Sequence, residues 1–175
     1  MYRAHSVTRS AWWFDNGPSG RFNLSGPRGT CYTATKVETA VREKVRDEIS
    51  SSGVVSKAFA ESFAVSVITA PVRYKCAAVS SARAVAFNVV RALVTMDDYS
   101  VPQAWAKSFE TNQFEGVYYG SAYTTGAASA LALFGDAGAA GAGFTAALHM
   151  EGPDACAAAG MVVAGPPSLT ALTLI

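Results

Sequence analysis

The sequence predicts an α+β fold in which short strands outnumber the helices. Half of the 175 residues are hydrophobic and only 15% are charged, so the chain has enough apolar side chain to build a core. Apolar residues alternate along several short segments, as in strands, whereas only two segments show clear helical spacing together with a start signal. The length fits one domain, and we expect residues 1–175 to form a single domain.

The first elements are read from strand patterns and turn clusters. Residues 1–7 alternate in part between apolar and polar side chains and predict a first strand. A dense group of turn formers at 15–20 predicts a loop, and a second group lies at 25–29. The β-branched and aromatic side chains of residues 30–33 then predict another strand.

The next segment has the pattern of an amphipathic helix. Thr35 and Glu38 have the spacing of a capping box, in which each side chain binds a backbone N–H at the helix start. Helical spacing predicts a helix over about 36–48, and the turn residues 50–53 end it. Its apolar positions are Val37, Ala40, Val41, Val45 and Ile49.

The middle of the chain, residues 54–95, is ambiguous. Residues 63–67 alternate like a strand. Residues 83–94 suit either a helix or a pair of strands, because periodicity does not separate the two in short apolar runs.

A second capping-box pattern starts the next helix. Ser100 and Gln103 have the required spacing, Pro102 lies in the first turn, and together they predict a helix to about Thr111. The rest of the chain predicts strands at 114–119, 129–134 and 144–150, a Gly/Ala-rich loop at 135–143, and an irregular tail that contains Gly165, Pro166 and Pro167.

Charge is distributed unevenly along the chain. Residues 1–107 contain all 14 basic residues and eight of the 13 acidic ones, a net charge of +6, while the remainder carries −5. Such asymmetry suggests an anionic partner, but the bases are dispersed, so we expect no direct nucleic-acid binding. No segment has the ~20 uninterrupted apolar residues of a membrane span, and the N-terminus lacks the apolar core of a secretory signal. We therefore expect a cytoplasmic protein without membrane contact.

Other familiar sites find little support. Cys31, Cys76 and Cys156 match neither a zinc pattern nor a paired disulfide framework, so we expect free thiols and no metal. The glycine pattern at 141–146 lacks an acidic residue ~20 positions further on, which argues against a dinucleotide-binding turn. Ser121 lacks the second glycine of a nucleophile elbow, which argues against a hydrolase triad.

One constellation distinguishes the sequence. Arg21 lies in a Gly-Arg-Phe-Asn motif, Tyr32 follows eleven residues later, and Glu43 eleven further in Ala-Val-Arg-Glu. Later segments read Pro-Gln-Ala-Trp-Ala at 102–106 and Gly-Val-Tyr-Tyr-Gly-Ser at 116–121. In this order the motifs resemble those of the RES-domain family, which is named for an arginine, a glutamate and a serine.

The resemblance spans roughly residues 2–135 and carries expectations about fold and function. It implies an ADP-ribosyltransferase-like fold, a mixed sheet with a few flanking helices. It also implies an enzyme that uses NAD as its substrate, a toxin of a bacterial toxin–antitoxin pair that cleaves the nicotinamide–ribose bond by hydrolysis or phosphorolysis. The implied protein partner is an antitoxin of the helix-turn-helix type that covers the active site.

Five positions take roles from the family. The resemblance makes Glu43, Arg21 and Ser121 the catalytic residues, with Glu43 as the essential acid. It makes Arg3, Arg21 and Tyr32 the residues that bind NAD, the arginines through its oxygens and the tyrosine through ring stacking. Ser121 would contact the nicotinamide carboxamide or position Glu43.

The chemistry explains why one carboxylate can suffice. Glycosidic cleavage passes through an oxocarbenium-like transition state, which a carboxylate stabilises. The nicotinamide ring is cationic while it is bonded to ribose and departs as a neutral molecule, so no general acid is needed.

Two alternative functions remain at this stage: an ADP-ribosyltransferase that modifies a protein or nucleic acid, and an inactive module that binds NAD or docks a partner. The sequence leaves the acceptor and the oligomeric state open, a homo-oligomer included.

Overall fold

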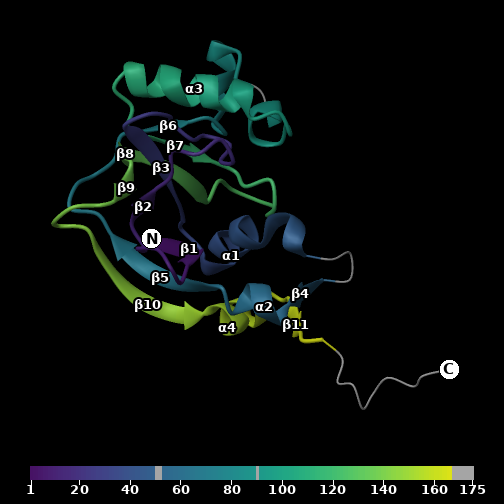
Figure 1. Cartoon of the computed structure of the whole chain (residues 1–175). Coiled ribbons are helices and arrows are strands. Elements are labelled where there is room, and N and C mark those ends of the chain that lie inside the picture. The colour runs from purple at the N-terminus through teal and green to yellow at the C-terminus, as the bar shows by residue number, and fades with distance from the viewer. Residues whose placement is uncertain (50–52, 90, 167–175) are drawn as a thin grey trace.

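The structure is a computed structural model that describes residues 1–49, 53–89 and 91–166 (Figure 1). Its strands are β1 (Tyr2–Ser6), β2 (Trp13–Phe14), β3 (Arg28–Ala34), β4 (Val54–Ser56), β5 (Phe63–Thr69), β6 (Cys76–Ala78), β7 (Gly116–Tyr119), β8 (Ala130–Asp136), β9 (Gly138–Ala139), β10 (Thr145–Glu151) and β11 (Val162–Ala164). Its helices are α1 (Val37–Val45), α2 (Lys57–Ala60), α3 (Ser100–Thr111) and α4 (Gly152–Ala158), with 3₁₀ turns at Arg46–Glu48, Ala82–Phe87 and Arg91–Val94.

A seven-stranded mixed sheet forms the centre of the described part of the chain. Its strand order is β10-β5-β1-β3-β8-β7-β6, and β6 and β7 are its parallel pair. Two small sheets, β2 with β9 and β4 with β11, lie beside it. Helix α3 lies over the β6–β7 end, and α1, α2 and α4 lie toward the other end (Figure 1). This arrangement confirms the predicted α+β class.

The sheet opens between β1 and β3. These neighbours share one registered pair, Tyr2 with Ala34, whereas β1 pairs with β5 over its whole length and β3 pairs with β8 likewise. Because the two strands diverge beyond that pair, no further registered backbone pair joins them, and side chains border the space between them. Helix α1 contacts both strands beside this opening.

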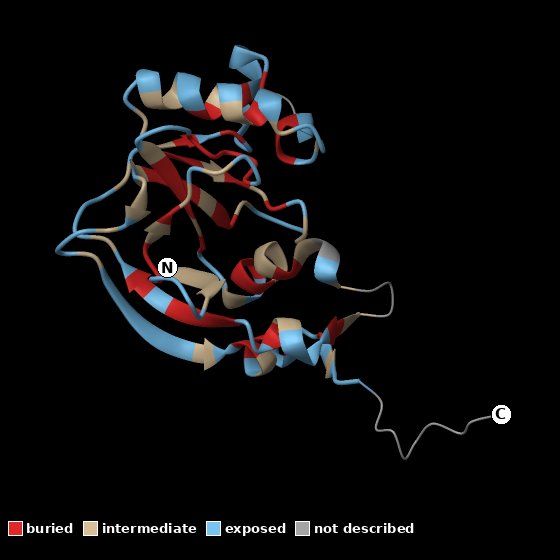
Figure 2. Cartoon of the chain, in the orientation of Figure 1, coloured by how far each residue is buried: buried red, intermediate tan, exposed pale blue. Residues whose placement is uncertain are grey.

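Apolar cores lie on both sides of the opening (Figure 2), and a third core joins Ile68 of β5 to Cys31 of β3 and Leu133 of β8. Tyr32 packs against the core under α3, and Tyr2 and Ala4 pack against the core under α1. The first core includes Phe22, Val117, Tyr119, Ala132 and Phe134, and the second includes Val41, Val45, Phe63, Val65 and Met161.

Strand β2 is fixed over the sheet by two glycines. Gly29 and Gly135 are register partners on β3 and β8. A Cβ at Gly135 would lie 2.5 Å from the Phe14 ring, and one at Gly29 would lie 2.6 Å from the Phe14 carbonyl oxygen. The glycines therefore allow Phe14, and with it the neighbouring Trp13, to approach the sheet closely.

Most predicted elements are present. The strands predicted at 1–7, 30–33, 63–67, 114–119, 129–134 and 144–150 correspond to β1, β3, β5, β7, β8 and β10. The two predicted helices correspond to α1 and α3, and Ala40, Val41 and Val45 of the predicted apolar stripe are buried. The predicted turn residues 50–52 lie outside the described residues.

The first predicted helix ends earlier than expected. Helix α1 stops at Val45 because Arg46 adopts a φ of 43°, which reverses the backbone, and a 3₁₀ turn replaces the last predicted turn. Positive φ is unfavourable for a side chain other than glycine, so tertiary contacts hold Arg46 in this conformation.

The capping box predicted for α1 is wrong. The N-cap is Lys36, without a side-chain cap, and the Thr35 hydroxyl instead donates to the Ser129 carbonyl at 3.4 Å. Glu38 forms an ion pair with Arg42 at 3.1 Å. Both side chains thus prefer partners that the spacing alone does not reveal.

The capping box predicted for α3 is also wrong. Tyr99 is the N-cap, and Ser100 is the first helical residue. The Gln103 side chain donates to the carbonyls of Pro18 and Gly20, both at 2.9 Å. Gln103 thereby ties α3 to the loop that leads into the buried segment 21–24.

Three further expectations need correction. In the segment 83–94 the described residues form 3₁₀ turns at Ala82–Phe87 and Arg91–Val94, and these residues contain neither an α-helix nor a strand pair. The Gly/Ala-rich loop at 135–143 contains the end of β8 and the short strand β9. Helix α4 and strand β11, which no sequence pattern predicted, lie between β10 and the predicted tail, and that tail lies outside the described residues beyond Pro166. Among the described residues, no helix is long and apolar enough to cross a bilayer.

Candidate active site

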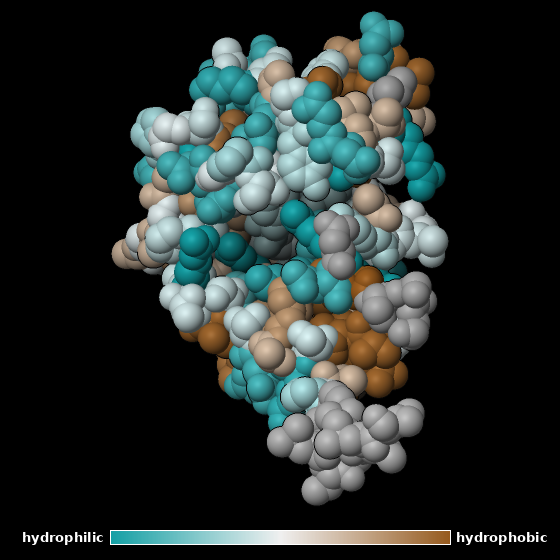
Figure 3. Space-filling view, turned by 45° about the vertical axis from the view of Figure 1, so that its right-hand side comes forward, coloured by the Kyte–Doolittle hydropathy of each residue, from teal (hydrophilic) through white to brown (hydrophobic). Residues whose placement is uncertain are grey.

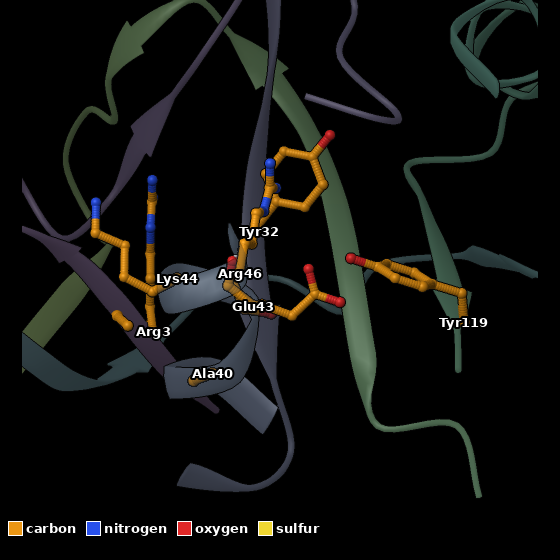
Figure 4. A pocket seen from close by; sticks show the side chains of 9 residues that line it. Arg3, Tyr32, Ala40, Glu43, Lys44, Arg46 and Tyr119 are labelled. Atoms are coloured by element: carbon orange, nitrogen blue, oxygen red, sulfur yellow. Dashed lines mark hydrogen bonds between the residues drawn. The ribbon is translucent and has the colours of Figure 1, made fainter. Parts of the chain in front are cut away.

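A polar cavity of about 260 Å³ occupies the opening between β1 and β3. The space-filling view shows a hollow near the middle of one face, with mainly hydrophilic residues around it (Figure 3). The cavity is lined from β1 by Arg3 and Ala4, from β3 by Tyr32 and Thr33, from α1 and its C-cap by Ala40, Glu43, Lys44 and Arg46, and across from Glu43 by Tyr119 (Figure 4). We call this space the inner basin.

Glu43 is the acid of the inner basin. Its carboxylate points from α1 across the cavity toward Tyr119 (Figure 4). Burial raises the pKa of Glu43, and hydrogen bonds from Ser121 and Tyr119 and the charges of Arg46 and Arg21 offset part of that rise. Burial outweighs them, so the pKa of Glu43 lies above the usual value of a glutamate.

Ser121 approaches Glu43 from just beyond β7. Its hydroxyl oxygen accepts a hydrogen bond from the Tyr123 N–H at 3.0 Å, and its side chain hydrogen-bonds Glu43. The acceptor side of the hydroxyl is engaged by the backbone, which leaves its proton for the carboxylate. Ser121 is buried and lies outside the inner basin, beside a neighbouring cavity of about 420 Å³. This geometry favours the role of positioning Glu43 over contact with the carboxamide.

Tyr32 forms a wall of the inner basin. Its hydroxyl oxygen accepts a hydrogen bond from the Phe22 N–H at 2.8 Å, which fixes the ring on β3. Burial raises the pKa of Tyr32, so the phenol is neutral. The ring is therefore a rigid, uncharged aromatic surface close to the Glu43 carboxylate.

Arg3 lies where β1 and β3 separate. Its Nη1 donates to the Ala11 carbonyl at 2.9 Å and to Cys31 Sγ at 2.6 Å. Burial raises the pKa of the Cys31 thiol to about 11, so Arg3 faces a neutral sulfur rather than an anion. The guanidinium charge of Arg3 is thus not cancelled by these contacts.

Arg21 is placed differently from Arg3. It is only 8% exposed, its Nη1 donates to the Met96 carbonyl, and its guanidinium lies 4.6 Å from the centre of the Tyr99 ring. It borders a small cavity of about 10 Å³ that Tyr32 and Glu43 also line. The structure thus brings Arg21 behind Glu43, where its charge favours the carboxylate, and not into the inner basin.

Lys44, Arg46 and Tyr119 are site residues that sequence reasoning did not single out. Arg46 donates from Nε to the Glu43 carbonyl at 2.9 Å. Lys44 follows Glu43 directly on α1, and Tyr119 lies in the 116–121 motif already quoted. Tyr119 could have been found from that motif. Lys44 reaches the site from α1 beside the opening between β1 and β3, and Arg46 reaches it through the chain reversal after α1, and no local pattern indicates either feature.

No group of three or more metal-ligating side chains gathers within the described ranges. Among the same residues the cysteines are free, with Cys31 and Cys156 buried and Cys76 half-buried. Metal independence stays a prediction.

Comparisons with known proteins bear on the family and the fold of the chain. The family model for the RES domain matches residues 1–152. No curated protein sequence matches the chain. Among solved structures, the chain is similar to a chain in the crystal structure of the M. tuberculosis MbcT–MbcA toxin–antitoxin complex, with a TM-score of 0.66 and 16% identity, over 91% of this chain and 85% of that one. The likeness confirms the fold class.

Proposed function

Because the chain belongs to the RES-domain family, we propose that it is an enzyme that cleaves the nicotinamide–ribose bond of NAD. The observation that carries the proposal is the half-buried Glu43 carboxylate, held by Ser121 and Tyr119 at the edge of a cavity that Tyr32 walls. A cationic ring suits such a site, because a carboxylate and an aromatic face both stabilise positive charge.

Each residue of the site has a separate role in the cleavage of the nicotinamide–ribose bond. As the bond between ribose C1′ and the ring nitrogen breaks, its electron pair leaves with nicotinamide, and positive charge develops on the ribose. Glu43 stabilises that charge, and Tyr32 stacks against the departing ring. Water or phosphate then forms the new bond to C1′, and the proton of water goes to solvent or to Glu43. Arg3 supplies positive charge for the substrate's phosphate oxygens.

Ionised Glu43 is needed for this step. Arg21 and Arg46 lower the pKa of Glu43, and Ser121 and Tyr119 hydrogen-bond its carboxylate. Arg21 thus contributes through Glu43, whereas Arg3 and Tyr32 face the substrate.

The biological role that fits the family is that of a toxin in a toxin–antitoxin pair, acting in the cytoplasm as a single domain over residues 1–175. The similar M. tuberculosis chain comes from a toxin–antitoxin complex. A partner antitoxin of the helix-turn-helix type would inhibit this chain by covering the mouth of the inner basin. Co-purification with the product of a neighbouring reading frame tests this part of the proposal.

The enzymatic proposal is tested by nicotinamide release. The purified chain is incubated with NAD, with and without phosphate, and we expect release that Glu43→Gln reduces by at least about 100-fold. Glu38→Gln is the matched control, since Glu38 lies exposed on the same helix and pairs with Arg42. Absence of release from the unmodified chain, or full release from the Glu43 variant, contradicts the proposal.

The alternatives give different outcomes in the same assay. Transfer of ADP-ribose to a macromolecule would leave a covalent adduct that mass spectrometry of an NAD-treated lysate detects. An inactive module would bind NAD without releasing nicotinamide.

A further inference from the structure

A second cavity of about 400 Å³ adjoins the inner basin. Arg3, Ala4 and Lys44 line both spaces, so the two adjoin along β1, and we call them together the cleft. We call the second space the outer basin. Beyond the shared residues it is lined by His5, Ser6, Thr8, Arg9, Trp13 and Asp15.

The boundary between the basins is positively charged. In the close-up, Arg3 and Lys44 extend along one side of the inner basin (Figure 4). Burial lowers the pKa of Lys44, and the charges of Arg46, Arg3 and Arg9 lower it further. The three arginines are therefore close enough to repel the Lys44 ammonium, and an anion at this boundary would relieve that repulsion. A diphosphate, with two adjacent negative charges, fits this requirement.

The outer basin carries a planar cation–aromatic pair. The Arg9 guanidinium carbon lies 5.1 Å from the centre of the Trp13 ring, and Arg9 also pairs with Asp15 at 3.6 Å. Nucleobases stack on aromatic rings and on guanidinium planes, and such stacking tolerates any base because every base has a π face.

The pair is held by rigid neighbours. Asp15 accepts from Asn23 Nδ2 at 2.7 Å and exchanges two backbone hydrogen bonds with Thr30 of β3, at 2.9 and 2.8 Å. Trp13 itself belongs to β2, which pairs with β9, and its neighbour Phe14 is locked over the sheet. Trp13 is half-buried, so its ring is both fixed and accessible.

We propose that the outer basin binds the nucleoside half of a dinucleotide, with its base stacked against the Arg9–Trp13 pair and its diphosphate held at the boundary by Arg3 and Lys44. The reacting half then occupies the inner basin. This inference rests on the proposed function, because it requires a dinucleotide whose cleaved bond lies at Glu43. It adds a binding subsite that discriminates whole dinucleotides from their mononucleotide halves.

The test compares NAD with nicotinamide mononucleotide, which carries the same scissile bond but lacks the adenosine half. Trp13→Ala is expected to lower kcat/KM for NAD by about 5- to 100-fold, the loss associated with one stacked base. The same change should leave kcat/KM for the mononucleotide within about twofold. Trp13→Phe should restore most of the loss. Phe87→Ala is the control, because Phe87 is an exposed aromatic residue that lines neither basin.

A binding measurement separates this inference from the proposed enzymatic function. Calorimetric titration with ADP, which has the base and the diphosphate but no nicotinamide, needs no turnover. Weaker ADP binding in Trp13→Ala and in Arg9→Gln supports the subsite even if no nicotinamide is ever released. Equal losses for NAD and the mononucleotide, or ADP binding that neither variant changes, would overturn it.

Discussion

At the scale of single residues, the candidate site depends on how Glu43 is kept ionised inside the protein. Burial favours the neutral acid, while two hydroxyl hydrogen bonds and two guanidinium charges favour the carboxylate. A carboxylate that is only partly solvated is a stronger electrostatic partner for a developing cation than one in water. The raised pKa of Glu43 is thus a consequence of the same burial that makes it effective.

Ser121→Ala tests this balance through pH. The Ser121 hydrogen bond lowers the pKa of Glu43, so its removal raises that pKa further. Less carboxylate is then present at any given pH, and the acid limb of kcat/KM for NAD should move to higher pH, while the rate well above the limb falls less. A pH–rate series on both proteins measures the shift. An unmoved limb with a uniform loss of rate would instead assign Ser121 to the substrate.

At the scale of elements, the sequence predicts what is local and misses what is not. The stripe that includes Val41 and Val45 predicts α1 because helical spacing and burial coincide in one segment. The capping boxes fail because Thr35 and Gln103 have tertiary acceptors that spacing does not encode. Helix α4 was missed because it is short, rich in alanine, and stabilised by what it packs against rather than by an amphipathic pattern.

The same distinction between local and tertiary features applies to the residues of the candidate site. Arg3, Tyr32 and Glu43 were found because their motif order is written in the sequence, and the structure brings them into one basin. Lys44 and Arg46 were missed because their place there depends on the divergence of β1 from β3 and on the reversal after α1. Both features are tertiary.

The start of α4 provides a test at this scale. A Cβ at Gly152 would lie 1.9 Å from the Ala60 carbonyl oxygen and 2.6 Å from that of Phe63, so backbone must move to admit it. Gly152→Ala should therefore destabilise the protein by about 1–3 kcal/mol, as overpacking does. Gly141→Ala is the matched control, because nothing lies within 4 Å of a Cβ there.

Urea unfolding of both glycine variants measures the difference. The midpoint should fall for Gly152→Ala and stay near that of the unmodified chain for Gly141→Ala. Equal midpoints for the two variants would show that α4 can shift away from α2 at little cost.

At the scale of the whole molecule, the uneven charge of the sequence places basic residues along the cleft, while the base-free part of the chain supplies strands of the sheet. The basic residues of the cleft, Arg3, Arg9, Lys44 and Arg46, all come from the first third of the chain. Residues 108–175, which contain no lysine or arginine, supply β7, β8 and β10 of the sheet. Two acidic residues of this part, Glu110 and Asp136, form ion pairs with Arg28 at 2.8 and 2.6 Å. Positive charge is therefore left concentrated along the cleft.

This distribution predicts how the reaction responds to salt. Cations along a cleft attract an anionic diphosphate, and added salt screens that attraction, with a Debye length of about 8 Å at physiological ionic strength. We expect kcat/KM for NAD to fall as ionic strength rises, chiefly through KM. Lys44→Gln should lower kcat/KM at low salt and make the decline shallower, because one of the charges that salt screens is gone. Arg83→Gln, which removes an exposed cation that lines neither basin, should retain both the rate and the slope of the unmodified chain. Parallel slopes for all three proteins would mean that Lys44 takes no part in drawing the substrate into the cleft.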